Sequence, residues 1–340
     1  VEGSESYIDS VQQLDMQLAI IGSGALGSLF AAVLSSRTNL VMLGHWPQQL
    51  VHLRSSGLTM IHPSGSQSAH HFTVTDDPTT IPTVDLALVL VKSYQTERAA
   101  LEIKHFLAGD GLAVTLQNGL GNIDILAQVL GHHRVAQGIT ALGATMLEPG
   151  VVRFAGHGPT HLAQPVEEHT ALPELAALMN ASGLVTHIAG NLLTLAWGKL
   201  VINCGINPLT ALLRVPNGFL ANNNKARTLM IAAAEETAAV AKALNIKLPY
   251  PDPSQRVLEV AQATAENQSS MLQDVLRGSQ TEIDAISGAV VKHGRSIGIP
   301  TPINAELLRL VQMLPTMKHG EAVVSTIEPL QALLSAPARD

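Results

Sequence analysis

The 340-residue chain has few or none of the features that indicate disulfide-rich, nucleic-acid-binding, membrane or secreted proteins. It has one cysteine, Cys204, which excludes a disulfide framework and suits a reducing compartment. It has no basic run and a net charge of −7, which argues against a nucleic-acid partner. It also lacks both an apolar run long enough to span a membrane and the charged, then apolar, start of a signal peptide. We therefore expect a cytoplasmic protein that binds neither nucleic acid nor membrane.

A zinc-type pattern is also missing, although the chain has 14 histidines. No histidine occurs with the His/Cys spacing of a zinc site. His157 and His161 are four residues apart, but Gly158 and Pro159 between them argue against one shared helical face. The sequence therefore predicts no metal site.

The length and the hydrophobic pattern predict an α/β protein of two domains. Short apolar runs alternate with helix-like segments as far as residue 188, which is typical of a parallel sheet wrapped by helices. The strands are expected at 18–21, 39–43, 85–91, 111–116 and 135–140, with a closing antiparallel hairpin of 150–154 and 160–162. Helices are expected at 191–213, 225–246, 254–276, 281–297 and 303–313. We interpret 1–15 as a polar extension, 16–188 as a Rossmann-type dinucleotide-binding domain, 189–334 as a helical substrate and dimerisation domain, and 335–340 as a tail.

The segment 22–27 carries a glycine fingerprint between an apolar strand and an apolar helix. In Gly22-x-Gly24-x-x-Gly27, the first glycine allows the sharp turn and the second lets the backbone approach a pyrophosphate. The third lets helix and strand pack closely, so that helix N–H groups point at the phosphates. The alternative is a glycine turn without a ligand, but the strand and helix context favours a nucleotide. The predicted contacts are Gly22, Ser23, Gly24, Ala25, Leu26 and Gly27.

The next strand bears on which dinucleotide binds. An NAD-binding fold places a carboxylate about 20 residues past the glycines to accept from the ribose 2′-hydroxyl. No Asp or Glu lies between Asp15 and Asp76, and this absence favours NADP. His45 stands where a cation could meet the 2′-phosphate, more weakly than arginine would. The alternative is that His45 is a solvated loop histidine.

Polar side chains also follow two later strands and mark one helix. Lys92 comes directly after one predicted strand and Asn118 comes two residues after another, although a solvated lysine and an ordinary turn would look the same. Lys199, Asn203 and Asn207 are spaced four residues apart and so share one face of a helix that is otherwise almost entirely apolar. That stripe is either an exposed face or the lining of a pocket. Because the other faces are apolar too, we favour the pocket.

Together these segments resemble the ketopantoate reductases, also called 2-dehydropantoate 2-reductases. The resemblance extends from residue 16 to about 315. The matching runs are GSGALG at 22–27, VKSYQ at 91–95, QNGLGN at 117–122, WGKLVINCGINPLTAL at 197–212, ATAENQSSMLQDV at 263–275 and TEIDAISG at 281–288. The last three runs are more specific than the glycines, because they occur in order within a helical domain. The resemblance implies a Rossmann domain followed by a helical domain like that of 6-phosphogluconate dehydrogenases.

The resemblance also implies roles for individual residues. Lys199 would be the general acid. The implied substrate contacts are Asn118, Lys199, Asn203, Asn207 and Ser270. The implied cofactor contacts outside the glycine run are Lys92, Gln95, Asn118, Ala144 and Glu282. The chain departs from the family at His45, where an arginine usually meets the 2′-phosphate.

The expected function is thus the NADPH-dependent reduction of 2-dehydropantoate to pantoate, on the route to coenzyme A. The expected partner is a small-molecule 2-keto acid, and the resemblance also allows a homodimer. One alternative is a related reductase acting on another 2-keto acid. Another is a sensor that binds NADPH without chemistry, which would be expected to have lost the polar stripe from Lys199 to Asn207.

Overall fold

The computed structural model describes residues 14–163 and 168–314, and these form two units. The first unit holds the described residues up to 91, then 95–117 and 123–190. The second holds 92–94, 118–122 and the described residues from 191 onward. Two short loops that the sequence assigned to the first domain thus belong to the second unit. Nearly all of the expected N-terminal extension and the whole expected tail lie outside the described residues.

The first unit is built on an eight-stranded sheet with the order β12-β11-β8-β7-β6-β1-β2-β5. Six strands of this sheet pair in parallel, namely β1, β2, β5, β6, β7 and β8. β11 runs antiparallel to β8, and β12 pairs with β11 in parallel. The strands are β1 Leu14–Ile21, β2 Thr38–Leu43, β5 Thr73–Thr75, β6 Val84–Val89, β7 Leu107–Thr115, β8 Val135–Thr140, β11 Thr160–Ala163 and β12 Thr186–Ile188. The expected α/β fold is confirmed.

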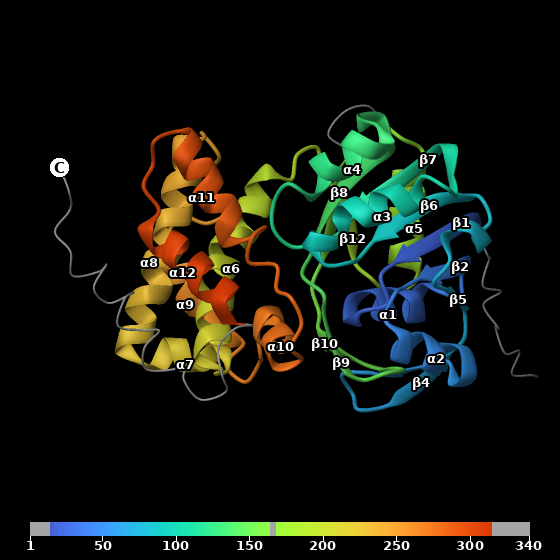
Figure 1. Ribbon diagram of the computed structural model, residues 1–340, viewed down its shortest axis with the longest axis horizontal. Coiled ribbons are helices and arrows are strands. Elements are labelled where there is room, and N and C mark those ends of the chain that lie inside the picture. The colour runs from blue at the N-terminus through green and yellow to red at the C-terminus, as the bar shows by residue number, and fades with distance from the viewer. Residues whose placement is uncertain (1–13, 164–167, 315–340) are drawn as a thin grey trace, which may run out of the picture. The chain divides into compact units, whose positions relative to one another are not determined.

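Both faces of this sheet are buried under helices, as continuous apolar strands require (Figure 1). In β1, Leu18 and Ile20 pack with α1 (Ala25–Leu34) on one face, while Ala19 and Ile21 face α3 (Thr96–Ile103) and α4 (Asn122–Leu130) on the other. The remaining helices of this unit are α2 Pro47–Ser56 and α5 Ala171–Ala181, and its 3-10 turns are η1 Pro78–Thr80 and η3 His132–Arg134. A further 3-10 turn, η2 Ser93–Gln95, has its first two residues in the second unit and its last in the first.

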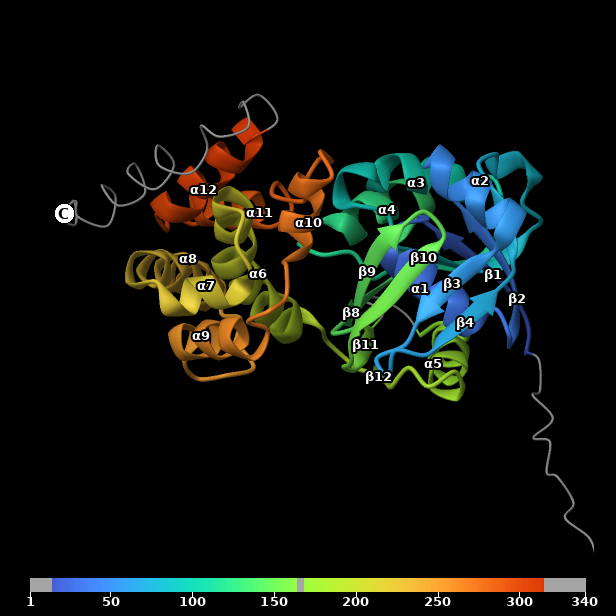
Figure 2. The same cartoon turned by 90° about the horizontal axis from the view of Figure 1, so that it is seen from below.

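A second, four-stranded sheet has the order β4-β3-β10-β9 and packs on α1 (Figure 2). Its strands are β3 Leu58–Ile61, β4 Gln67–His70, β9 Gly143–Glu148 and β10 Val151–Gly156. The expected hairpin of 150–154 with 160–162 is therefore wrong. The turn at 149–150 pairs β10 with β9, whereas β11 joins β8 in the large sheet.

The described part of the second unit is helical and is built around one long helix, α6 (Leu193–Leu213). This helix packs against α7 Asn217–Asn222, α8 Asn224–Ala243, α9 Pro253–Ala263, α10 Ser270–Leu276 and α12 Pro302–Met313, and α11 Ser287–Ser296 completes the unit. Cys204 lies fully buried on α6, and burial raises the pKa of its thiol to about 12.

Two of the expected helices are shorter than predicted. The helix expected at 254–276 breaks between α9 and α10, because Ser269 accepts a hydrogen bond from the Leu272 N–H and so begins a new helix. The helix expected at 281–297 begins only at Ser287, and residues 282–286 form turns instead. Both corrections fall on segments that carry candidate site residues.

Candidate active site

The glycine fingerprint forms the turn between β1 and α1. Gly22 has φ +121°, a conformation that favours glycine, and its N–H donates to the Leu43 carbonyl at 2.8 Å. A Cβ on Gly27 would lie 1.9 Å from the Gly22 oxygen. Position 27 therefore requires glycine, because the helix and the turn approach closely there. A Cβ on Gly24, in contrast, would meet nothing within 4 Å.

This turn fits a pyrophosphate. Gly24 is the N-cap of α1, no side chain caps the helix, and its first turn contains no acidic residue. The N–H groups at the start of α1 therefore keep their capacity to bind an anion, and the helix dipole favours one there. The open space beside Gly24 is where a backbone without Cβ lets phosphate oxygens come close.

The segment after β2 lies directly against this turn. A Cβ on Gly44 would lie 2.5 Å from Ser23 Oγ, so only glycine fits between the strand end and the dinucleotide loop. His45 follows, and its Nε2 lies 2.8 Å from Glu102 Oε1 on α3. A carboxylate is thus present at the end of β2 after all. No local pattern predicts it, because Glu102 is 57 residues from His45 and the fold alone brings them together.

The other expected coenzyme contacts of the first unit come from two elements. Gln95 ends the 3-10 turn η2 and is the N-cap residue of α3. Ala144 lies on β9, opposite Phe154 of β10. Both side chains are partly buried.

In the second unit, the polar stripe lies on α6 as its spacing predicts. Lys199 and Asn203 are partly buried and Asn207 is buried, while Trp197, Leu200 and Val201 are core residues. Burial lowers the pKa of Lys199 to about 8, against the opposing effect of the Glu282 carboxylate. Tyr250, which the sequence did not single out, donates a 2.7 Å hydrogen bond from its hydroxyl to the Gly198 carbonyl and so anchors the backbone beside Lys199.

Glu282 contacts both of the short loops, 92–94 and 118–122, that belong to this unit. It is 5% exposed and accepts from the Ser93 N–H at 3.0 Å and from Asn118 Nδ2 at 3.3 Å. Lys92 Nζ lies 3.5 Å from Glu282 Oε2 and 2.6 Å from Asp274 Oδ2. Burial alone would lower the pKa of Lys92, but these two carboxylates outweigh it and raise the pKa above the ordinary lysine value. Buried charges are stable only when paired in this way.

Asp274 is a residue that the sequence interpretation did not choose. It lies on α10 and is 3% exposed. Asp274 lies within the run 263–275, but in the sequence a buried helical aspartate cannot be distinguished from a solvated one. Lys92 supplies that partner from 182 residues away.

Ser270 is the first residue of α10, and its position depends on its neighbour. The Ser269 hydroxyl accepts from the Leu272 N–H at 3.1 Å and lies 2.7 Å from the Thr210 hydroxyl of α6. Thr210 also donates to the carbonyls of Ile206 and Asn207. One hydrogen-bonded chain therefore links Ser269, the residue before Ser270, to the end of the polar stripe.

The comparison with known proteins decides the family. The model for the ketopantoate reductase family PanE/ApbA matches residues 18–167, and the model for its C-terminal part matches residues 191–314. The chain belongs to the ketopantoate reductase family. The resemblance inferred from the motifs is confirmed, and so is the expectation of an oxidoreductase.

Relatives and solved structures agree with this assignment. The 2-dehydropantoate 2-reductase of Halobacterium salinarum is 35% identical over 302 residues, which cover 87% of this chain and 99% of that protein. The enzyme of Pyrococcus horikoshii with the same name is 31% identical over 306 residues, covering 90% and 99%. A PanE/ApbA family ketopantoate reductase from Ralstonia eutropha has a TM-score of 0.81 at 31% identity, over 88% of this chain and 99% of that one.

A further solved structure bears on the coenzyme and the substrate. A D-mandelate dehydrogenase, solved as a ternary structure with NADH and anilino(oxo)acetate, has a TM-score of 0.82 at 25% identity, over 88% of this chain and 99% of that one. The present chain is accordingly a dinucleotide-binding reductase with a small-molecule substrate.

The described residues contain neither a cluster of metal ligands nor a membrane-spanning helix. Within residues 14–163 and 168–314, no group of three or more His, Cys, Asp or Glu side chains could hold a metal ion. Among the helices that the structure describes, none is long and apolar enough to cross a membrane.

Proposed function

We propose that this ketopantoate reductase reduces 2-dehydropantoate to pantoate with NADPH and uses Lys199 as the proton donor. The relatives named 2-dehydropantoate 2-reductase support the reaction, because the match covers 99% of each of them. The observation that carries the mechanism is that Lys199 shares one face of α6 with Asn203 and Asn207, where burial lowers the pKa of the lysine to about 8.

Lys199 is suited to the proton transfer. A bound nicotinamide supplies the hydride that adds to the ketone carbon. Negative charge develops on the ketone oxygen, and Lys199 Nζ stabilises it and donates the proton that completes the hydroxyl. With a pKa of about 8, Lys199 is mainly protonated at neutral pH and still gives up its proton more readily than an ordinary lysine.

The remaining side chains position the reactants. Asn203 and Asn207 follow Lys199 by one and two helical turns, so they are placed to hold the distal hydroxyl of the substrate without adding charge. Ser270 and Asn118 are the further substrate contacts in this proposal. The loop from Gly22 to Gly27, with Lys92, Gln95, Ala144 and Glu282, provides the contacts for the dinucleotide.

A second candidate is the reduction of another 2-keto acid. The fold similarity to D-mandelate dehydrogenase, which was solved with an aromatic 2-oxo compound, is the observation that favours it. The mechanism would be unchanged, and only the residues around the substrate side chain would differ in fit.

Initial rates of NADPH and NADH oxidation with a panel of 2-keto acids test the proposal. The panel should vary branching, an aromatic ring and the distal hydroxyl. We expect the highest kcat/KM with 2-dehydropantoate and NADPH. A clear preference for an aromatic 2-keto acid would select the second candidate. Coenzyme binding without oxidation for any compound would indicate a non-catalytic protein.

A further inference from the structure

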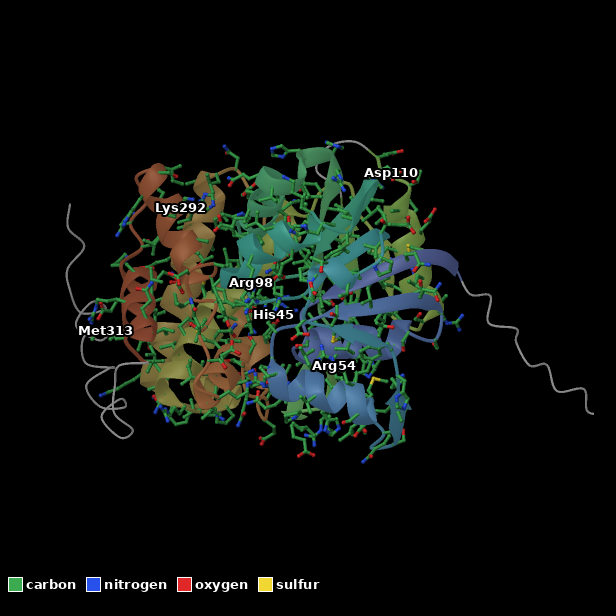
Figure 3. The ribbon with its side chains drawn as sticks, turned by 45° about the vertical axis from the view of Figure 1, so that its right-hand side comes forward. His45, Arg54, Arg98, Asp110, Lys292 and Met313 are labelled. Carbon is green, nitrogen blue, oxygen red and sulfur yellow. The ribbon has the colours of Figure 1, made fainter. Side chains whose placement is uncertain are left out.

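Two basic side chains share one carboxylate at the carboxyl end of β2. Glu102 Oε1 lies 2.8 Å from His45 Nε2 and 3.7 Å from Arg98 Nε, and Arg98 is one helical turn from Glu102 on α3. Figure 3 shows Arg98 and His45 close together on adjoining elements of the first unit. The catalytic role proposed for Lys199 makes no use of Arg98 or Glu102.

This cluster lies beside the dinucleotide loop. His45 follows Gly44, and an ideal Cβ on Gly44 would lie 2.5 Å from Ser23 Oγ within the loop. β1 and β2 are parallel neighbours that end side by side, at Ile21 and Leu43. In a Rossmann-type fold, the ribose of the adenosine half reaches the end of the second strand. The cluster therefore stands where the ribose 2′ substituent would be recognised.

The side chains of Arg98 and His45 are more exposed to solvent than that of Glu102. The side chain of Arg98 is 48% exposed and that of His45 is 29% exposed, whereas Glu102 is only 15% exposed. The Nε of Arg98 is beyond hydrogen-bond distance of Glu102, so the pair does not occupy the guanidinium as a bidentate contact would. The other nearby carboxylate, Asp76, accepts from Arg54 Nη2 at 2.6 Å. An approaching anion would thus meet Arg98 and His45 first.

On the proposed function as a basis, we infer that Arg98 binds the 2′-phosphate of NADPH, with His45 beside it and Glu102 holding both side chains in place. Arg98 takes over, from α3, the role that an arginine at the position of His45 would have. Its guanidinium presents the forked donors that match a phosphate, which an imidazole lacks. Glu102 is a positioning residue, because one of its oxygens lies next to both His45 and Arg98.

The competing assignment is that Glu102 accepts from the 2′-hydroxyl of NADH. This assignment is disfavoured because Glu102 is less exposed than its two basic neighbours, His45 and Arg98, and already lies next to both. The two assignments predict opposite coenzyme preferences, so binding measurements separate them without relying on catalysis.

The test compares 2′,5′-ADP with 5′-AMP, which differ only in the 2′-phosphate, by calorimetric titration of the wild-type protein and Arg98→Ala. We expect the variant to lose about 10- to 100-fold in affinity for 2′,5′-ADP, the scale for a hydrogen bond to a charged group, and to bind 5′-AMP as the wild type does. Arg98→Lys, which keeps the charge without the fork, should lose less. Arg256→Ala is the matched control, since Arg256 is 47% exposed and pairs with Glu259 of its own helix.

Equal affinity of the wild type and Arg98→Ala for 2′,5′-ADP would overturn the assignment while leaving the proposed function intact. Glu102→Gln separates the competing assignment: an unchanged affinity for NADH supports our inference, and a selective loss of NADH affinity overturns it. Failure of the wild type to bind 2′,5′-ADP, 5′-AMP and both dinucleotides would overturn the proposed function, and the 2′-phosphate site with it.

Discussion

The two units use opposite means to prepare for a charged ligand. In the first, the dinucleotide loop uses backbone N–H groups at the start of α1, where no side-chain cap and no acidic residue intervene. In the second, charged side chains are taken out of water and paired, with Lys92, Asp274 and Glu282 close together. Glu282 is also the carboxylate that counters the lowered pKa of Lys199.

This difference determines what each unit tolerates. Backbone recognition depends on the absence of side chains, so the loop should be sensitive to added volume. A buried charge network depends on each partner being present, so it should be sensitive to a lost charge and less sensitive to volume. The predictions below test this contrast, beginning with the largest effect.

Lys199→Ala removes the proton donor and should lower kcat for ketone reduction by roughly 10²–10³-fold, the scale for losing a donor to a developing oxyanion. Coenzyme affinity should remain close to that of the wild type. Steady-state rates together with a fluorescence titration of NADPH measure the two effects. Lys242→Ala, at the end of α8, is a control for loss of a lysine. A higher KM at unchanged kcat would mean that Lys199 only binds substrate.

The pH dependence tests the charge network itself. Because Lys199 must be protonated to act as an acid, kcat for reduction should be constant below its pKa of about 8 and fall about tenfold per pH unit above it. Glu282 opposes the lowering of that pKa, so Glu282→Gln should move the falling limb to lower pH. A limb that stays in place in the variant would show that Glu282 does not act on Lys199.

A matched pair of glycine substitutions tests the backbone half of the contrast. Gly24→Ala places its Cβ in open space, so the protein should fold normally but lose about tenfold or more in dinucleotide affinity, or about 1.4 kcal/mol. Gly27→Ala forces a Cβ against the Gly22 oxygen and should destabilise the fold by about 1–3 kcal/mol. Thermal unfolding and NADPH titration separate the two results. Equal behaviour of the two variants would contradict this description of the loop.

Ser269→Ala should have the smallest effect. The substitution removes the N-cap of α10 and the contact with Thr210, so we expect a loss of about 1–2 kcal/mol in the free energy of unfolding. Ser254→Ala, at an exposed position on α9, should lose less. Denaturant unfolding measures both. A raised KM in Ser269→Ala would show in addition that the cap holds Ser270 in place.

The contrast between the units also explains which features could be predicted from the sequence. The parallel sheet and the glycine turn depend on local patterns, and so does the stripe on α6, where a period of four residues places Lys199, Asn203 and Asn207 on one face. The pairing of β10 with β9, the break before α10 and the late start of α11 were not predicted. Each depends on a turn or a cap that competes with an otherwise regular pattern.

Contacts between distant parts of the chain had no local signal. Asp274 and Glu102 are ordinary helical acids in the sequence, and only the fold gives Asp274 its lysine and Glu102 its histidine. The sequence near the end of β2 contains no carboxylate. The tertiary structure brings one there from α3.

The single cysteine has a practical consequence for following motion in this enzyme. Maleimide reagents react with thiolates, and a fully buried thiol with a pKa of about 12 supplies almost none at neutral pH. Cysteines introduced at the exposed positions Ser55 on α2 and Gln255 on α9 would therefore take fluorescent dyes without background from Cys204. Energy transfer between the dyes would report directly whether coenzyme or keto acid changes the separation of the two units.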